Sequence, residues 1–327
     1  MKIVAYVHFM MPHHYAGSEV MILNLMKNAQ RAGHDVSIIA TYEAHSEWVY
    51  DGVQCYGETS EFTGFNRLQH LNPDIIITHH HETFAARSYA QYLNIPMVQL
   101  IHNNNQHQGR THPLLDVGAD FVIYNTEWVQ EWYSNSYTHD SCVVHPPVFP
   151  EDHETISGSK VTLVNLNAHK GAEIFYELAR RLPNVEFLGV EGGHGPQLYE
   201  RWDNVELQLQ TTNMRDDVWR KTRLLLMPSI YESYGMVGVE ALASGIPVLA
   251  TPTPGLKESL GDAGIFIDRD NIDHWQHVIE DMLTNDQSYA QQSFLARKRI
   301  AELDPHAESL ACITQLERVV SEWPMQR

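Results

Sequence analysis

Residues 224–264 constrain the fold more than any other stretch of the chain. The first of them, 224–227, form a short apolar run of the kind found in buried parallel strands. A polar loop at 229–234 follows, then helical spacing over 235–243 and a second apolar run at 246–250. This order predicts a βαβ unit, and ligands of parallel α/β sheets bind beyond the carboxyl ends of the strands. We therefore expect the 229–234 loop to lie at a ligand site.

Two glutamates in this stretch have seven residues between them. Glu232 is in the predicted loop, and Glu240 is about one turn into the predicted helix, which rises ~1.5 Å per residue. Gly235 and Gly238 leave the backbone bare, and the first N–H groups of a helix have no intrahelical partner. A diphosphate with a sugar on one side and a ribose on the other fits this geometry. The alternative interpretation is that both glutamates are solvated surface acids.

The same stretch resembles the signature of family 4 of the nucleotide-sugar glycosyltransferases, which have the GT-B fold. The matching segments are Pro228-Ser229, the Glu232 and Glu240 pair, residues 244–248, Pro254-Gly255 with Glu258, and residues 261–264. One departure is Pro254, where the family often has a second glycine. The resemblance implies a transferase that retains the anomeric configuration of the sugar.

The chain length and the pattern of elements predict an α/β protein with two domains. At 327 residues, about two domains are expected from a prior of ~150 residues each. Alternating strand and helix patterns fill residues 1–148 and start again in residues 149–327, and the Pro146-Pro147 pair is typical of a linker. The resemblance implies two Rossmann-like domains facing across a cleft, the first on the acceptor side and the second binding the nucleotide sugar. It also implies that the amphipathic helix predicted at 309–323 crosses back to the first domain.

The resemblance assigns roles to individual residues. Lys170, in a strand-to-helix loop, would contact the donor diphosphate, and Glu240 would bind the ribose. Glu232 would hold donor-sugar hydroxyls, and His102, which follows the predicted strand 97–101, would touch the donor sugar. The candidate catalytic residues are thus Glu232, Lys170 and His102. The candidate donor-binding residues are Gly17, Asn165, Lys170, Gly193, Met214, Glu232, Ser233, Tyr234, Gly235, Met236, Val237 and Glu240.

Four of these donor contacts depart from the family pattern or rest on weaker signals. Asn165 stands where many members have an arginine, so one phosphate contact is missing. Gly193 belongs to the glycine-rich loop 191–195, which in the family lies beside the nucleotide base, and the backbone near Met214 is a second candidate base contact. Gly17 is what remains of a glycine pair in the family's first turn. We expect Ser18 to cap the following helix and Glu19 to point away from a phosphate.

The histidines and cysteines do not predict a metal site. His79, His80 and His81 follow a predicted strand, and successive strand side chains point to opposite faces, so all three are not expected to converge on one ion. The three cysteines are widely spaced and form no CxxC pair, which suits a reducing cytosol and argues against a disulfide framework. No cofactor is expected beyond the nucleotide-sugar donor, because Lys170 and the helix dipole would neutralise the diphosphate as Mg²⁺ does in other enzymes.

The net charge of −19 disfavours generic binding to nucleic acid or to anionic lipid. The densest basic clusters, Arg180-Arg181 and Arg220 to Arg223, are interpreted as solvated helix surface, and no apolar run approaches the ~18 residues of a membrane span. We therefore predict a cytoplasmic protein. The loops Met10–Gly17 and His102–Arg110 contain one arginine and no lysine, which favours a small or glycan-like hydroxyl acceptor. Two alternatives stay open: transfer to a hydroxymethylated base in DNA, and a sugar-nucleotide-binding protein without turnover, for which Asn165 is the support.

Overall fold

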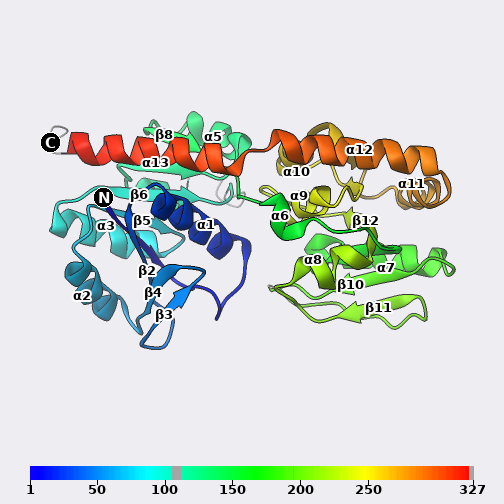
Figure 1. Cartoon of the computed structure of the whole chain (residues 1–327), viewed down its shortest axis with the longest axis horizontal. Coiled ribbons are helices and arrows are strands. Elements are labelled where there is room, and N and C mark those ends of the chain that lie inside the picture. Colours follow the sequence, from blue (N-terminus) through cyan, green and yellow to red (C-terminus); the bar gives the residue numbers. More distant parts are fainter. Residues whose placement is uncertain (105–111, 194, 324–327) are drawn as a thin grey trace. The chain divides into compact units, whose positions relative to one another are not determined.

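A computed structural model describes residues 1–104, 112–193 and 195–323. The chain divides into two compact units, each built on a largely parallel sheet (Figure 1). Unit 1 comprises Met1–Pro147 together with Pro305–Arg327, and unit 2 comprises Val148–Asp304. The change of unit at Pro147 falls within the run that the sequence predicted as a linker.

The sheet of unit 1 has the strand order β3-β4-β2-β1-β5-β6-β7-β8 within the described residues. β3 pairs with β4 in antiparallel fashion, and the other pairings are parallel. The strands are β1 (Lys2–Val7), β2 (Asp35–Ala40), β3 (Ser46–Tyr50), β4 (Val53–Gly57), β5 (Ile75–His79), β6 (Met97–Ile101), β7 (Phe121–Tyr124) and β8 (Ser141–Val143). Most are continuous apolar runs with buried side chains, as expected for a sheet covered on both faces.

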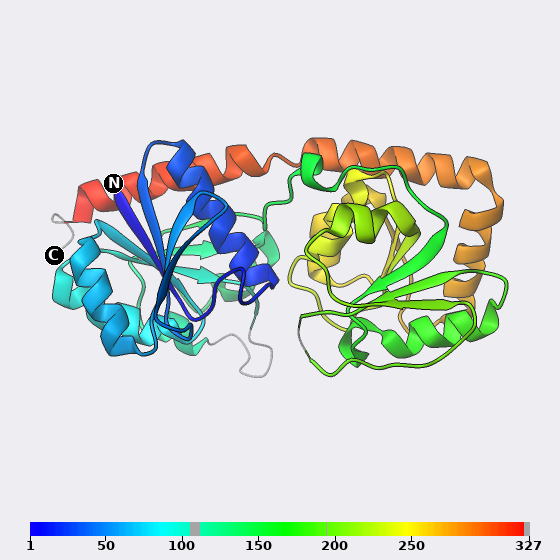
Figure 2. The same cartoon turned by 60° about the horizontal axis from the view of Figure 1, so that its bottom comes forward.

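Helices cover this sheet, and Figure 2 shows them on both of its faces. They are α1 (Gly17–Arg31), α2 (Glu61–Leu71), α3 (Glu82–Leu93), α4 (Pro113–Asp116), α5 (Glu127–Ser134) and α13 (Pro305–Glu322). α13, drawn in red in Figure 1, packs on α1, and its buried face carries Ile313 and Leu316. The predicted return of the last helix to the first domain is confirmed. Leu310, which shares the helical spacing of Ile313 and Leu316, is nevertheless exposed.

The start of α1 differs from the prediction. The helix begins at Gly17 with Ala16 as its N-cap residue, and that N-cap makes no side-chain hydrogen bond. Ser18 therefore lies inside the first turn, where its hydroxyl donates to the carboxylate of Glu19 at 2.9 Å. The predicted Ser18 cap was wrong because glycine and serine both enter the helix. Gly33, with φ +91°, follows the helix end.

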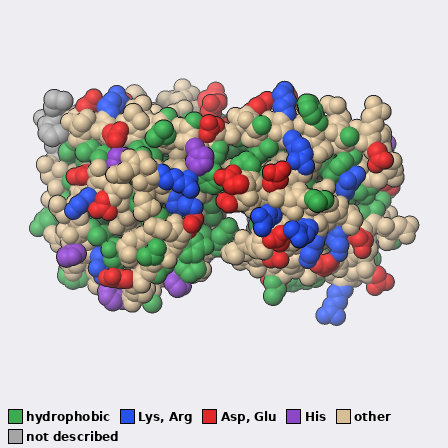
Figure 3. Space-filling model, in the orientation of Figure 1, with side chains coloured by type: hydrophobic (Ala, Val, Ile, Leu, Met, Phe, Trp, Pro, Cys, Tyr) green, Lys and Arg blue, Asp and Glu red, His purple; other side chains and the backbone are tan. Residues whose placement is uncertain are grey.

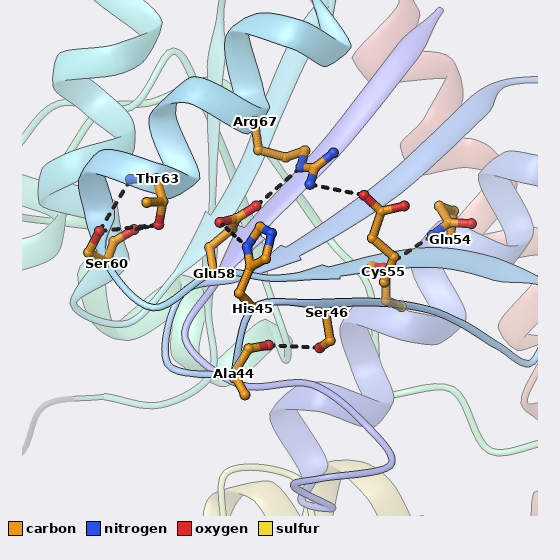
Figure 4. A network of polar contacts seen from close by, with 10 residues as sticks. Ala44, His45, Ser46, Gln54, Cys55, Glu58, Ser60, Thr63 and Arg67 are labelled. Carbon is orange, nitrogen blue, oxygen red and sulfur yellow. Dashed lines mark hydrogen bonds and ion pairs between the residues drawn. The ribbon is translucent and has the colours of Figure 1, made fainter.

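A buried carboxylate joins the β3–β4 edge of unit 1 to α2 (Figure 4). Glu58 is 2% exposed, and its two oxygens lie 3.1 Å from Nε of Arg67 and 3.1 Å from Nδ1 of His45. Arg67 also reaches Oε1 of Glu47 on β3 at 2.9 Å. A buried charge is costly unless it is paired, so Arg67 stabilises the buried carboxylate of Glu58. Because Arg67 belongs to α2, the same contacts hold α2 against the edge of the sheet.

The sheet of unit 2 has the order β11-β10-β9-β12-β13-β14, and its described pairings are parallel. Its strands are β9 (Lys160–Val164), β10 (Phe187–Val190), β11 (Val205–Gln208), β12 (Thr222–Met227), β13 (Val248–Ala250) and β14 (Gly264–Phe266). Its helices are α6 (Pro150–His153), α7 (Ala172–Arg181), α8 (Met214–Asp217), α9 (Met236–Ala243), α10 (Pro254–Leu260), α11 (Ile272–Thr284) and α12 (Asp286–Glu302). The chain adds β10 and β11 on one side of β9 and then β12 on the other. The strand order thus reverses between β9 and β12, which is where ligands of open α/β sheets bind.

Candidate functional site

Two loops of unit 2 follow the strands at this reversal. The first, after β9, forms a 3₁₀ turn over Ala168–Lys170. The side-chain oxygen of Asn167 caps the turn by accepting from the backbone N–H groups of His169 at 2.8 Å and Lys170 at 3.2 Å. This cap fixes the backbone from which the Lys170 side chain extends.

The first loop is packed directly on the second, which follows β12. Gly171 has φ +92°, and a Cβ atom there would lie 2.4 Å from Cγ of Pro228. The N–H of Ile230 donates to the carbonyl of His169 at 2.8 Å. Arg269 adds a further link, because its Nε donates to the carbonyl of Pro228 at 3.0 Å. Only a residue without a side chain fits at position 171, so the glycine after Lys170 allows the two loops to touch.

The contact between the loops brings Lys170 and Glu232 together. Nζ of Lys170 lies 2.5 Å from Oε1 of Glu232, and the Ser229 hydroxyl donates to the same oxygen at 2.9 Å. Glu232 is buried, whereas Lys170 is about one-third exposed. The structure thus places two of the three candidate catalytic residues in one ion pair at the carboxyl end of the sheet.

The start of α9 completes this part of unit 2. Gly235 is the N-cap residue with φ +87°, and a Cβ there would lie 2.6 Å from Leu256. Tyr234 is 3% exposed and its ring packs in the apolar core, so only its backbone is available to a ligand. Met236 and Val237 likewise pack their side chains against that core. This first turn therefore offers backbone N–H groups, which carry the positive end of the helix dipole.

Glu240 lies further along α9 and has a different neighbour from Glu232. Its side chain is 12% exposed, and Oε2 lies 3.8 Å from Nδ1 of His153. Within the described residues, Oε2 is buried without a hydrogen-bond partner. Burial raises the pKa of the Glu240 carboxyl, and the neighbouring His153 acts in the opposite direction. A buried carboxylate oxygen that lacks a donor is suited to accept a hydrogen bond from a ligand hydroxyl.

Sequence reasoning missed Gln197, which holds the residues around Asn165. Asn165 has φ +73°, a left-handed conformation that asparagine tolerates, and its Oδ1 accepts from Nε2 of Gln197 at 2.9 Å. Oε1 of Gln197 accepts from the N–H groups of Leu166 at 2.8 Å and Gly192 at 3.0 Å. Gln197 therefore joins the end of β9 to the glycine-rich loop. Nothing in its sequence spacing indicates this contact, because the two partners are 32 residues apart.

The remaining donor-binding candidates lie at the ends of elements. Gly193 follows β10, and His194 beside it lies outside the described residues. Met214 starts α8 and packs against the core of unit 2. Gly17 starts α1 of unit 1.

In unit 1, His102 follows β6 and contacts a second histidine. Its Nε2 lies 2.9 Å from Nδ1 of His79, and its carbonyl accepts from Nδ2 of Asn125 at 2.8 Å. Burial, together with the charges of His80 and His8, holds the pKa of His102 well below its usual range. His102 is therefore a neutral imidazole at neutral pH. Residues 105–110 of the predicted His102–Arg110 loop lie outside the described residues.

We expected the side chains of His79 and His80 to point to opposite faces of a strand, and this prediction was wrong. β5 ends at His79, and His80 has φ +51°, so the regular alternation of a strand stops between them. As a result, one nitrogen from each of His79, His80 and His102 lies within 4.8 Å of the others.

The basic clusters form ion pairs with neighbouring acids. Arg180 and Arg181 both contact Glu177, at 2.6 Å each. Arg220 contacts Asp216 at 2.9 Å, and Lys221 contacts Glu206 at 2.9 Å. In Figure 3, blue basic side chains correspondingly lie among red acidic ones. Each of these four basic residues is thus paired with an acidic side chain.

Two further observations concern the whole chain. No helix within the described residues is both long and apolar enough to cross a membrane. The three cysteines, Cys55, Cys142 and Cys312, are free thiols.

Two units, each built on a largely parallel sheet, are the architecture of the GT-B class of proteins. HepE from Anabaena, solved in complex with UDP-glucose, aligns with a TM-score of 0.78 and 16% identity, covering 97% of this chain and 100% of that one. Sucrose-phosphate synthase from Thermosynechococcus elongatus aligns with a TM-score of 0.76 and 15% identity, covering 97% and 98%. The predicted GT-B fold is confirmed.

Sequence comparison identifies the family. Residues 161–299 match the model described as "Glycosyl transferases group 1", and residues 15–152 match "Glycosyltransferase Family 4". Together these two models span most of the chain, which belongs to the family of glycosyltransferases that they describe. The predicted resemblance is thereby confirmed.

Curated relatives match parts of the chain. A D-inositol 3-phosphate glycosyltransferase from Mycobacterium sp. (strain KMS) is 29% identical over 198 residues, covering 51% of this chain and 45% of the relative. A protein of the same name from Paenarthrobacter aurescens (strain TC1) is 34% identical over 93 residues, covering 28% and 21%. The matches thus span less than half the length of these relatives.

Proposed function

We propose that this protein transfers a sugar from a UDP-sugar to a hydroxyl acceptor with retention of the anomeric configuration. The observation that carries the proposal is the Lys170–Glu232 ion pair, which lies where the strand order of unit 2 reverses. Both residues fall in the segment that matches the group 1 glycosyltransferase model. The solved complex of HepE with UDP-glucose supports a UDP-linked donor over a GDP-linked one.

The diphosphate is the part of the donor that unit 2 is best equipped to bind. Lys170 supplies a full positive charge, and the backbone N–H groups at Met236 and Val237 supply the positive end of a helix dipole. Both would stabilise the charge that develops on the departing diphosphate, and stabilisation of that kind accelerates the reaction. Lys170 is held by Glu232 before the donor arrives, so it is oriented in advance.

The remaining contacts follow from the partners of each residue. Glu232 would accept hydrogen bonds from donor-sugar hydroxyls, and Glu240 would accept them from the ribose through its buried Oε2. Gly193 and Met214 would border the base by their backbone. Asn165 is fixed by Gln197 and contributes no charge, so Lys170 and the helix would carry the phosphate contact that an arginine makes in other members.

His102 is proposed as a contact to the donor sugar. Its Nε2 already contacts His79, so Nδ1 would be the ring nitrogen that forms a hydrogen bond with a sugar hydroxyl. The acceptor is proposed to be a small or glycan-like hydroxyl compound, because the basic clusters are paired with acids. The name of the curated relatives, D-inositol 3-phosphate glycosyltransferase, supports a small polyol as the first acceptor class to test.

The proposal is tested by donor turnover. The purified chain is incubated with UDP-glucose and a panel of polyol and glycan acceptors, and UDP release and product mass are measured. Glu232→Gln should lower kcat/KM about 10- to 100-fold, as expected for the loss of a hydrogen bond to a charged group. Glu280→Gln, an exposed acid on α11, is the matched control and should leave the rate unchanged.

Two outcomes would contradict this function. A wild-type chain that binds UDP-sugars but releases no UDP with or without acceptor would be a binding protein without turnover. A product with inverted anomeric configuration, read by the proton coupling constant at the anomeric carbon, would refute retention.

A further inference from the structure

A second group of polar residues lies at the strand reversal of unit 1. The order β2-β1-β5-β6 places β1 beside β5, so the strand order reverses between them. His8 follows β1, His79 ends β5, and Glu19 lies in the first turn of α1. The contacts assigned to the nucleotide sugar in unit 2 use neither His8 nor Glu19.

The three side chains are close enough to share one ion. Nε2 of His8 lies 3.8 Å from Oε1 of Glu19, and the His8 and His79 ring centroids are 5.2 Å apart. One ligand atom from each of the three residues lies within 4.8 Å of the other two. Nitrogen and oxygen donors at 2.0–2.2 Å from a tetrahedral metal lie roughly 3.4 Å apart, so the side chains need only a small inward movement.

The environment of these residues favours a bound cation. Glu19 is 1% exposed, so its carboxylate would contact an ion in a site that is largely shielded from solvent. His79 is fully buried, and within the described residues its Nε2 has no hydrogen-bond partner.

We propose that His8, Glu19 and His79 bind a divalent first-row transition metal ion such as Zn²⁺. Two imidazoles and one carboxylate are a common donor set for these ions, and they leave further positions for water. Nδ1 of His79 would then donate to Nε2 of His102, which is 2.9 Å away, as metal-bound histidines usually donate their second N–H group. The ion would thereby fix the tautomer of His102.

The geometry favours this set over His79, His80 and His102, whose ring nitrogens also lie within 4.8 Å of one another. Since Nδ1 of His79 and Nε2 of His102 are already joined at 2.9 Å, a metal between them would break that hydrogen bond. The His8–Glu19–His79 set keeps it. The His8 side chain is 15% exposed, which gives an ion a route to the site.

The test is metal titration of the tag-free chain after treatment with EDTA and desalting. Co²⁺ binding is followed by its visible absorption and Zn²⁺ binding by calorimetry. We expect a single ion per chain and a Co²⁺ spectrum typical of four- or five-coordination. His8→Gln and Glu19→Gln should each weaken binding at least ~100-fold, since loss of outer-shell partners alone costs 10- to 100-fold. His45→Gln, an exposed histidine of the same unit, is the control and should bind as the wild type does.

Thermal melting separates loss of the site from loss of the fold. Zn²⁺ should raise the Tm of the wild type and of His45→Gln, and leave that of a folded Glu19→Gln unchanged. Absence of Co²⁺ uptake by the wild type would overturn the proposal, and so would wild-type affinity in both His8→Gln and Glu19→Gln. Loss of binding in His80→Gln with normal binding in Glu19→Gln would assign the ion to the other set.

Discussion

Gly171→Ala tests how the loop that carries Lys170 is held. Gly171 has φ +92°, and a Cβ there would meet Pro228 atoms at 2.4, 2.8 and 2.9 Å. Adopting a left-handed conformation costs alanine about 1–2 kcal/mol. Alanine also lowers the conformational entropy of the unfolded chain, which offsets about 0.4–1 kcal/mol of that cost. The contact with the rigid proline ring adds about 1–3 kcal/mol of overpacking. We therefore expect Gly171→Ala to lower the free energy of unfolding of unit 2 by about 2–4 kcal/mol.

Gly33→Ala is the matched control for this substitution. Gly33 has φ +91°, and nothing lies within 4 Å of the position of its Cβ atom. The unfolding free energy of Gly33→Ala therefore measures the cost of the left-handed backbone without a steric clash. Its unfolding free energy should fall by about 1 kcal/mol. Urea unfolding, with hydrogen exchange and mass spectrometry to report each unit separately, measures both variants. Equal losses in the two variants would refute the claim that contact with Pro228 positions the Lys170 loop.

Four further predictions follow from buried groups and from the surface. Glu240→Gln should weaken UDP binding by roughly 1.5–3 kcal/mol in calorimetric titration. Since burial raises the pKa of Glu240, the folded state binds its proton more tightly than the unfolded state does. The wild type should therefore lose stability as the pH rises above the usual glutamate range, and Glu240→Gln should lose less; equal pH profiles in thermal melts would contradict this. Arg67→Met leaves Glu58 buried without its arginine and should cost about 3–5 kcal/mol of unfolding free energy, whereas Arg318→Met, in an exposed pair, should cost under about 1 kcal/mol. Labelled sugar should not be transferred to hydroxymethylated DNA at ordinary salt; transfer, with an affinity that falls as salt rises, would show a basic surface elsewhere.

The βαβ unit at the centre of the site could be predicted because its signals are local. The apolar run at 224–227 predicted strand β12, and the helical spacing over 235–243 predicted helix α9. The loop between them was placed at the carboxyl end of the sheet by a general rule for parallel sheets. The contact of Lys170 with the same ligand was implied by the family resemblance, and it is consistent with β9 and β12 being neighbours in the sheet.

The sequence-based predictions failed where one residue leaves a regular backbone conformation, or where residues far apart in the sequence come into contact. His80 adopts a left-handed backbone without any glycine to signal it, and this brings its ring toward His102. The hydrogen bonds that Gln197 makes to Asn165 and Leu166 join residues about 30 positions apart, which no local period encodes. Leu310 matches the helical spacing yet is exposed, because the spacing predicts a face but not where the partner surface stops.

Steady-state kinetics and donor affinity of Lys170→Ala test the central claim most directly. Lys170 is proposed to act mainly on the charge that builds up as the diphosphate departs, so its removal should affect the transition state more than the bound donor. We predict a fall in kcat of about 10²- to 10³-fold, with a smaller change in the Kd for UDP-sugar. Lys298→Ala, an exposed lysine on α12, should behave as the wild type does. A normal kcat in folded Lys170→Ala, with only a raised KM, would contradict the account.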